Sequence, residues 1–301
     1  MALKTSPLHE YHLEYGVKMA PFGNWSLPLH FENGINAEAR HCLTGVSLFD
    51  LCGSGKFRLA GDAKKLDSHF TPAPSALAIG ETGRFMQGNS DCVRLLRMAE
   101  NDFLMIASPI SPLPAFDGVE VQDLTAVFAR FFLCGAQAQE SLAALGAEDF
   151  PAENCWGKIS VDGINAIAFE SVFGEIRGWN LLFNAEVADQ LWDLFLENEN
   201  IEPAGYGALE ALRISAGIPA RGNELNVADT GIPAVIDLDK SRIPRKGTPV
   251  LSGGKEIGKV TSGALNPKTG KATLLALLLE PAEAVQADGI DGIIRWSDKS
   301  L

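Results

Sequence analysis

Three breaks in the hydrophobic pattern constrain the fold of this 301-residue chain more than any other feature. The first covers residues 71–75, the second covers residues 109–114 with three prolines in six residues, and the third is the basic stretch 240–247. Proline lacks the backbone donor that a sheet needs, and it disfavours helix in the residue before it. These segments are therefore predicted to be loops or domain joints.

Between the breaks, helical and strand periodicities alternate without a regular β-α-β order. Helices are predicted over residues 36–44, 62–70, 136–145, 185–197 and 207–215. Strands are predicted over residues 92–98, 103–107, 126–133, 158–161, 164–169, 179–183, 256–260 and 272–279. Asp62 is a candidate N-cap, and Asp162-Gly163 predicts a two-residue hairpin turn. The chain is therefore predicted to be α+β, with a small all-β module after residue 239.

Composition excludes several classes of protein. Apolar residues make up 46% of the chain, which is enough for a full core and excludes a disordered chain. Acidic side chains outnumber basic ones by 38 to 25, and a net charge of −13 argues against a nucleic-acid partner. The apolar run around residues 274–279 is shorter than the roughly 20 residues that a membrane span needs.

The first seven residues and the cysteines both favour a cytoplasmic protein. The segment before residue 8 lacks the apolar stretch of a signal peptide. The five cysteines are odd in number and none falls in a C-x-x-C motif, which favours reduced thiols over a disulfide scaffold.

Two short motifs suggest chemistry that their spacing does not support. His9-Glu10-Tyr11-His12 has one residue too few for the H-E-x-x-H zinc motif, and no metal site is predicted. Gly53-Ser54-Gly55-Lys56 resembles a phosphate loop, but the first glycine and the final Ser/Thr of that motif are missing. A G-x-S-x-G elbow is also absent, so a serine hydrolase has no support.

A longer set of motifs is more specific. In chain order they are T-S-P-L-H-E-Y-H (5–12), M-A-P-F-G-N-W-S-L-P (19–28), G-V-S-L-F-D (45–50), G-E (174–175), P-A-G-Y-G-A (203–208), L-R (212–213), G-N-E (222–224) and G-K-V-T-S-G (258–263). In composition and order these motifs resemble those of the glycine-cleavage T-protein (aminomethyltransferase) family. The resemblance covers nearly the whole chain.

This resemblance implies a three-domain cloverleaf around a folate pocket. A discontinuous folate-binding domain would comprise residues 1–52 and 119–238, interrupted by a ferredoxin-like α+β domain at 53–118. A small β-barrel would occupy residues 239–301.

The resemblance also implies a tetrahydrofolate-dependent one-carbon transferase that moves an aminomethyl or methyl group. Its partners would be folate and a small one-carbon donor or a lipoyl carrier protein. A carboxylate that starts the strand after a glycine-rich hairpin lies beside the folate nitrogens in that family, and Asp91 takes this position. A carboxylate can stabilise a developing iminium cation and orient an attacking amine, so Asp91 is the predicted catalytic residue. A turn residue at a strand entry is the structural alternative.

Five further residues are carried over as candidate folate contacts: Phe85, Glu175, Asn180, Arg213 and Glu224. Arg213 would pair with a folate carboxylate. Phe85 replaces a tyrosine and would stack on an aromatic ring, although core packing also explains a phenylalanine there. Asn180 takes the place of the glutamate that grips the pterin amino edge, and an amide is the weaker partner for that edge.

Several ligand positions depart from the family pattern. Ser90 replaces the first acidic residue of the hairpin pair, Val172 and Phe173 replace a Tyr-Thr pair, and Arg221 replaces a tyrosine. Two alternatives therefore stay open: a non-catalytic folate-binding or regulatory protein on the same scaffold, and a demethylase that moves a methyl group from a sulfonium or amine to folate. The related iron–sulfur assembly proteins are disfavoured, because no cysteine follows Cys155.

Overall fold

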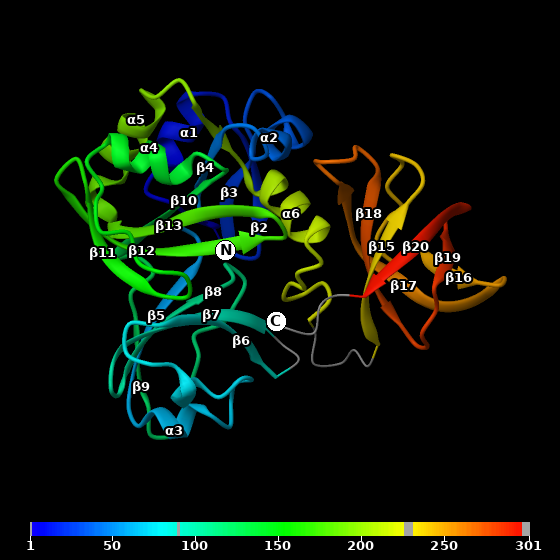
Figure 1. The fold of residues 1–301 in the computed structure, drawn as a ribbon, viewed down its shortest axis with the longest axis horizontal. Helices are drawn as coiled ribbons and strands as arrows, with labels where there is room; N and C mark the ends of the chain where they lie inside the picture. Colours follow the sequence, from blue (N-terminus) through cyan, green and yellow to red (C-terminus); the bar gives the residue numbers. More distant parts are fainter. Residues whose placement is uncertain (1, 89–90, 226–230, 297–301) are drawn as a thin grey trace.

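The computed structural model describes residues 2–88, 91–225 and 231–296, and within them the strands form three sheets and one closed barrel (Figure 1). The architecture is mixed α+β, as predicted from the sequence. The barrel lies to one side of the molecule, and helix α6 faces it from the main body (Figure 1). Position 90, which replaces an acidic residue of the family hairpin, lies outside the described residues.

A six-stranded sheet forms the centre of the main body, in the order β11-β12-β13-β10-β4-β14. Its strands are β4 (Val46–Asp50), β10 (Phe128–Cys134), β11 (Trp156–Val161), β12 (Ile164–Phe173), β13 (Ile176–Asn184) and β14 (Ile201–Ala204). Helices α1 (His9–Glu14), α4 (Ala138–Ala144) and α5 (Ala188–Leu196) lie near this sheet (Figure 1), and the 3-10 turn η2 (Ala185–Val187) directly precedes α5. Trp192 of α5 is fully buried against Phe131, with ring centroids 5.3 Å apart. Burial of such aromatic pairs is the main term that holds helix and sheet together.

A small N-terminal sheet, β1 (Lys4–Thr5), β3 (Trp25–His30) and β2 (Lys18–Phe22), lies beside helices α2 (Ile35–His41) and α6 (Tyr206–Ser215). Helix α6 ends where it was predicted to end. Gly217 has a φ of +74°, and the amide of Ile218 donates to the carbonyl of Arg213, which closes the last turn.

The inserted unit is a five-stranded antiparallel sheet in the order β6-β7-β8-β5-β9. Its elements are β5 (Gly55–Ala60), α3 (Ala63–Leu66), η1 (Pro74–Ala76), β6 (Thr82–Gln87), β7 (Asp91–Ala99), β8 (Asp102–Ala107) and β9 (Glu120–Asp123). Asp62 caps α3 as predicted, since its carboxylate accepts from the amide of Lys64. The predicted helix 62–70 was too long, because Asp67 accepts from the amide and hydroxyl of Ser75 and turns the chain.

The closed barrel has the strand order β15-β18-β17-β16-β19-β20. Its strands are β15 (Ile232–Leu238), β16 (Pro249–Ser252), β17 (Lys255–Leu265), β18 (Ala272–Leu278), β19 (Ala284–Ala287) and β20 (Ile290–Trp296). Its interior is aliphatic, and Ile236, Leu274 and Leu278 are fully buried there. Closure of the barrel leaves none of its strand edges unpaired, which stabilises a small unit of this kind.

Strand pairing crosses two of the predicted domain boundaries. Strand β15 pairs with β18 and β20, so the barrel begins before residue 239. Strand β9 pairs with β5, so the inserted sheet extends beyond residue 118. The chain leaves the six-stranded sheet after β4 and re-enters it at β10, and these two strands are direct neighbours with Asp50 opposite Phe131.

The predicted hairpin at Asp162-Gly163 is confirmed. Val161 pairs with Ile164, and both turn residues have positive φ, +47° and +80°. This is the backbone of a type I′ turn, for which Asp-Gly is a favoured pair.

Candidate functional site

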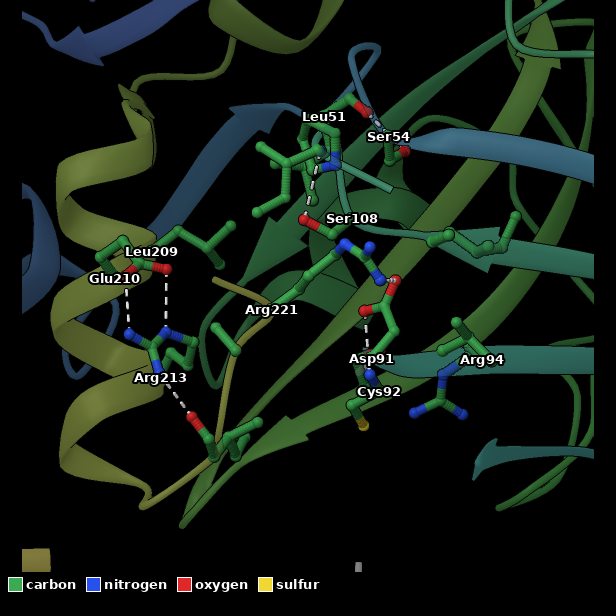
Figure 2. A pocket seen from close by; sticks show the side chains of 18 of the residues that line it. Leu51, Ser54, Asp91, Cys92, Arg94, Ser108, Leu209, Glu210, Arg213 and Arg221 are labelled. Atoms are coloured by element: carbon green, nitrogen blue, oxygen red, sulfur yellow. Dashed lines mark hydrogen bonds and ion pairs between the residues drawn. The ribbon is translucent and has the colours of Figure 1, made fainter. Parts of the chain in front are cut away.

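A cavity of about 360 Å³ lies where the six-stranded sheet, the inserted sheet and helix α6 meet (Figure 2). Strands β2, β6, β7, β8, β10, β12 and β13 supply lining residues, together with α6, the segments 108–110 and 218–221, and Asn223. Phe22, Ile106, Phe132 and Phe173 give it largely apolar walls. A cavity of this size and character, with a few polar groups directed into it, is typical of a small-molecule site.

Asp91 is the first residue of β7 and lines this cavity. Its side chain is buried, at 1% relative exposure. Oδ1 accepts from the amide of Cys92 at 2.9 Å, and Oδ2 accepts from the hydroxyl of Ser111. Arg221 Nη1 lies 3.7 Å from Oδ2, and Figure 2 shows its guanidinium group directed at the carboxylate.

Burial raises the pKa of Asp91 above its usual range, whereas the Ser111 hydrogen bond, the Arg221 charge and the Cys92 amide each lower it. Removal of a carboxylate from water disfavours its charged form, and donors and cations restore it. Asp91 is therefore a buried carboxylate with a shifted pKa in an apolar cavity, which is a common property of catalytic groups. The sequence placed Asp91 at a strand start, and the strand does begin there.

Asn180 lies in β13 and also lines the cavity, with a fully buried side chain. Its Oδ1 accepts from Nε and Nη2 of Arg130, at 3.0 and 2.6 Å. Its Nδ2 donates to the hydroxyl of Ser171 at 2.9 Å and to the carbonyl of Phe169 at 3.3 Å. The amide oxygen of Asn180 is thus already engaged by two donors of Arg130.

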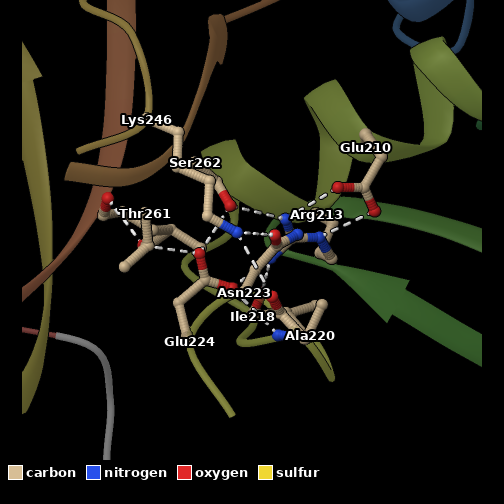
Figure 3. A network of polar contacts seen from close by, with 11 residues as sticks. Glu210, Arg213, Ile218, Ala220, Asn223, Glu224, Lys246, Thr261 and Ser262 are labelled. Atoms are coloured by element: carbon tan, nitrogen blue, oxygen red, sulfur yellow. Dashed lines mark hydrogen bonds and ion pairs between the residues drawn. The ribbon is translucent and has the colours of Figure 1, made fainter. Parts of the chain in front are cut away.

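Arg213 lines the cavity, but its donors are used within the protein (Figure 3). It makes a two-point pair with Glu210, at 2.9 and 2.7 Å, and donates to Glu224 at 3.0 Å and to the carbonyl of Ile218 at 2.7 Å. Burial lowers the pKa of Arg213, but Glu210 and Glu224 outweigh this effect and raise it. Two carboxylates therefore balance its charge without a ligand.

Glu224 is buried and is not among the residues that line the cavity. Besides Arg213, it accepts from the amide of Ala220 at 3.0 Å and from the hydroxyls of Thr261 at 2.7 Å and Ser262 at 2.5 Å. Thr261 and Ser262 belong to β17 of the barrel. Figure 3 shows that the network joins α6 to the barrel, so the contacts of Glu224 in this structure are all within the protein.

Two further predicted contacts lie away from the cavity. Phe85 is buried in the core of the inserted sheet beside Phe70, because alternation along β6 turns Arg84 to the cavity and Phe85 to the opposite face. Glu175 lies in the turn between β12 and β13 and is 85% exposed, and its carboxylate pairs with Lys268 at 2.7 Å. This ion pair lowers the pKa of Glu175.

Sequence reasoning missed Arg84, Arg94 and Arg130, which all line the cavity. Each lies inside a strand, between residues of which at least one is apolar. An arginine within a predicted strand can indicate a binding residue, but the sequence does not show onto which face of which sheet its side chain projects.

The described residues lack two kinds of feature. None of their helices combines the length and apolar character needed to cross a membrane. Nor does any group of three or more His, Cys, Asp and Glu side chains gather there as a candidate metal site.

Fold and site together define a small-molecule site enclosed by separate β units, with a buried carboxylate at its wall. Comparison with known proteins gives the family. The family model described as the GCVT N-terminal domain matches residues 8–240, and the chain belongs to this aminomethyltransferase family. This confirms the resemblance inferred from the motifs.

Individual relatives agree with this assignment. The aminomethyltransferase of Deinococcus deserti is 28% identical and aligns with 96% of this chain and 92% of its own length. That of Thermotoga neapolitana is 26% identical, with 92% and 90% coverage. The crystal structure of glycine cleavage system aminomethyltransferase T from Bartonella henselae superposes with a TM-score of 0.85 at 20% identity, over 98% and 97% of the two chains, and shows the same fold. The chain is an enzyme, a transferase of the glycine cleavage T type.

Proposed function

We propose that this transferase moves a one-carbon group to tetrahydrofolate and that Asp91 is its catalytic carboxylate. The observation that carries the proposal is the buried carboxylate of Asp91 in the wall of an apolar cavity. Tetrahydrofolate, when bound, supplies amine nitrogens that take up the one-carbon unit.

The cavity fits a heteroaromatic one-carbon carrier in two respects. Phe132 and Phe173 provide aromatic surface for a ring, and Asp91 provides an anionic acceptor for an amine. Asp91 would hold the amine and stabilise positive charge that develops on the transferred carbon. Its contacts to Ser111 and Arg221 fix the orientation of the carboxylate and favour its charged form.

The one-carbon donor would be a small molecule or an aminomethyl group on a lipoyl carrier protein. The fit is weaker at one position, since Arg130 occupies the oxygen of Asn180, where the family has a glutamate for the pterin amino edge. This observation favours a second candidate, a folate-binding or regulatory protein without catalysis. A demethylase that uses folate as acceptor is the third, and it differs from the first only in its donor.

The test compares the wild type with Asp91→Asn, which keeps the shape of the side chain and removes its charge. Asp162→Asn is the matched control, because Asp162 is an exposed hairpin residue with a left-handed backbone that asparagine also tolerates. We expect Asp91→Asn to retain its melting temperature and its calorimetric binding of tetrahydrofolate, and to lose at least a hundredfold in single-turnover transfer.

Each outcome has a distinct reading. Full transfer activity in Asp91→Asn would refute the catalytic role. Tetrahydrofolate binding without transfer from either an aminomethyl-lipoyl carrier protein or small methyl donors would favour the regulatory alternative. Failure of the wild type to bind tetrahydrofolate would refute the first two candidates and the demethylase together.

A further inference from the structure

Three arginines gather at the part of the cavity wall that contains Asn180. Arg84 comes from β6, Arg94 from β7 and Arg130 from β10, and all three line the cavity. In Figure 2, Arg94 lies directly beyond Asp91 and Cys92 along the same strand. The inserted sheet and the six-stranded sheet thus each contribute positive charge to one wall.

None of these three arginines is in direct contact with a carboxylate of the described residues, although the charge of Glu170 acts on Arg94 from a greater distance. Among the residues that the structure describes, no Asp or Glu oxygen lies within 4 Å of the guanidinium nitrogens of Arg84, Arg94 or Arg130. Arg84 donates instead to the carbonyl of Val172 at 2.7 Å, and Arg130 donates to the neutral amide of Asn180. Arg213 lines the same cavity, but unlike these three arginines it is paired directly with two carboxylates.

The register of the inserted sheet places two of these like charges side by side, which lowers the stability of the fold. Arg84 and Arg94 are direct partners across the antiparallel pair β6–β7, so their side chains leave the same face at neighbouring positions. Like charges placed directly opposite each other destabilise a sheet. Burial, followed by the charges of Arg84 and Arg130, lowers the pKa of Arg94 to about 9, although the charge of Glu170 acts in the opposite direction.

Aromatic faces hold two of these groups in place. The guanidinium of Arg84 lies 5.7 Å from the ring centroid of Phe173, and that of Arg94 lies 5.4 Å from the ring centroid of Phe169. Stacking on a ring leaves the edge of a guanidinium, with its N–H donors, free to meet an acceptor. Guanidinium groups that are held in place and lack a direct carboxylate partner are what a planar oxyanion requires of its binding site.

We propose that Arg84, Arg94 and Arg130 form an oxyanion-binding subsite that takes a carboxylate group of the small molecule bound in the cavity beside Asp91. The inference rests on the proposed function only in assigning that carboxylate to a one-carbon donor or to folate. The anion balances the repulsion between Arg84 and Arg94, and Asp91 then faces the reactive, cationic part of the same complex. The net charge of −13 on the whole chain gives no hint of such a site.

The experiment measures binding of acetate, succinate and sulfate by calorimetry at constant ionic strength, with succinamide as the neutral analogue of succinate. The variants are Arg94→Gln, Arg84→Gln and the charge-preserving Arg94→Lys. Arg58→Gln is the matched control, since Arg58 lies in the same sheet but is exposed and paired with Asp102. Each variant is also melted without ligand.

We expect at least one anion to bind the wild type and Arg58→Gln, and succinamide to bind neither. Arg94→Gln and Arg84→Gln should weaken anion binding at least tenfold, and Arg94→Lys should restore part of it. Arg94→Gln should also melt no lower than the wild type without ligand, because it removes one of two opposed like charges; a merely structural arginine would give a lower melting temperature.

The tetrahydrofolate affinity of Arg94→Gln identifies the source of the carboxylate. A tenfold loss assigns it to the glutamate of folate, and an unchanged affinity assigns it to the donor. The proposal is overturned if none of the anions binds the wild type, or if they bind Arg94→Gln as tightly. Anion binding together with failure to bind tetrahydrofolate would refute the proposed function alone.

Discussion

The network around Glu224 allows a quantitative prediction about how the barrel is held. Glu224 is 4% exposed and accepts hydrogen bonds from Ala220, Arg213, Thr261 and Ser262. Breaking a buried ion pair by removal of one partner costs about 3–5 kcal/mol, because an uncompensated charge stays buried. Arg213 keeps its two-point pair with Glu210, so we expect Glu224→Ala to lose about 3 kcal/mol, at the lower end of that range.

Glu210→Ala is the matched comparison, because it removes the other carboxylate of the same arginine. The Glu210 side chain is 38% exposed, and water replaces its contacts at little cost. Exposed pairs contribute roughly 0–1 kcal/mol, so Glu210→Ala should lose no more than about 1 kcal/mol. Glu224→Gln, which keeps the size and one acceptor oxygen, should fall between the two alanine variants.

The assay is equilibrium unfolding in urea, followed by far-ultraviolet circular dichroism, with the free energy of unfolding taken from the midpoint and slope. The difference between the two alanine variants should be about 2 kcal/mol. Equal losses, or a larger loss for Glu210→Ala, would show that burial of the carboxylate does not set the energy of its pair with Arg213.

Three further predictions concern pH and packing. Burial raises the pKa of Asp91 and Arg221 lowers it, so the transfer rate should fall on the acidic side at a pH above 3.8. This acidic limb should move to higher pH in Arg221→Gln, and an unmoved limb in a pH–rate profile would contradict the prediction. Burial lowers the pKa of Lys56 from 10.5 to about 8, so the unfolded state binds more protons between these values and stability should rise with pH. The free energy of unfolding of the wild type minus that of Lys56→Met should therefore increase by about 3 kcal/mol from pH 8 to 10.5, and a flat difference in urea unfolding would oppose it. Gly135 has a φ of +143°, and a Cβ there would overlap the carbonyl oxygen of Gly45, so Gly135→Ala should cost about 3 kcal/mol or prevent expression of folded protein, as judged by gel filtration and melting.

Local chemistry made part of this structure predictable. The Asp162-Gly163 turn, the Asp62 cap and the end of α6 each depend on residues within a few positions of one another. The alternation of helical and strand periodicities predicted the α+β class, and motifs that extend over the chain identified the family. Asp91 was located because it follows a recognisable hairpin at the start of a strand.

The unpredicted parts depend on partners that are distant in sequence. Glu224 is fixed by Thr261 and Ser262, which lie 37 and 38 positions away in another unit. Phe85 turned to the core because the register of β6 sets which of two neighbouring side chains faces the cavity. A one-residue change of register exchanges the two faces of a strand, and the sequence of one strand does not determine it.

The position of the inserted sheet has a consequence for how ligand preference can change in such a protein. The segment from Gly55 to Asp123 leaves and rejoins the central sheet at two adjacent strands, and Phe57 and Asp123 are paired near its ends. Insertions whose ends lie close together can be exchanged without strain on the host. Asp91, Arg84 and Arg94 all lie in this segment, so one continuous segment carries the proposed catalytic carboxylate and two of the three arginines of the proposed subsite. Recombination or engineering could therefore supply a new chemistry by exchange of one continuous piece of gene, while the rest of the enzyme keeps its sequence.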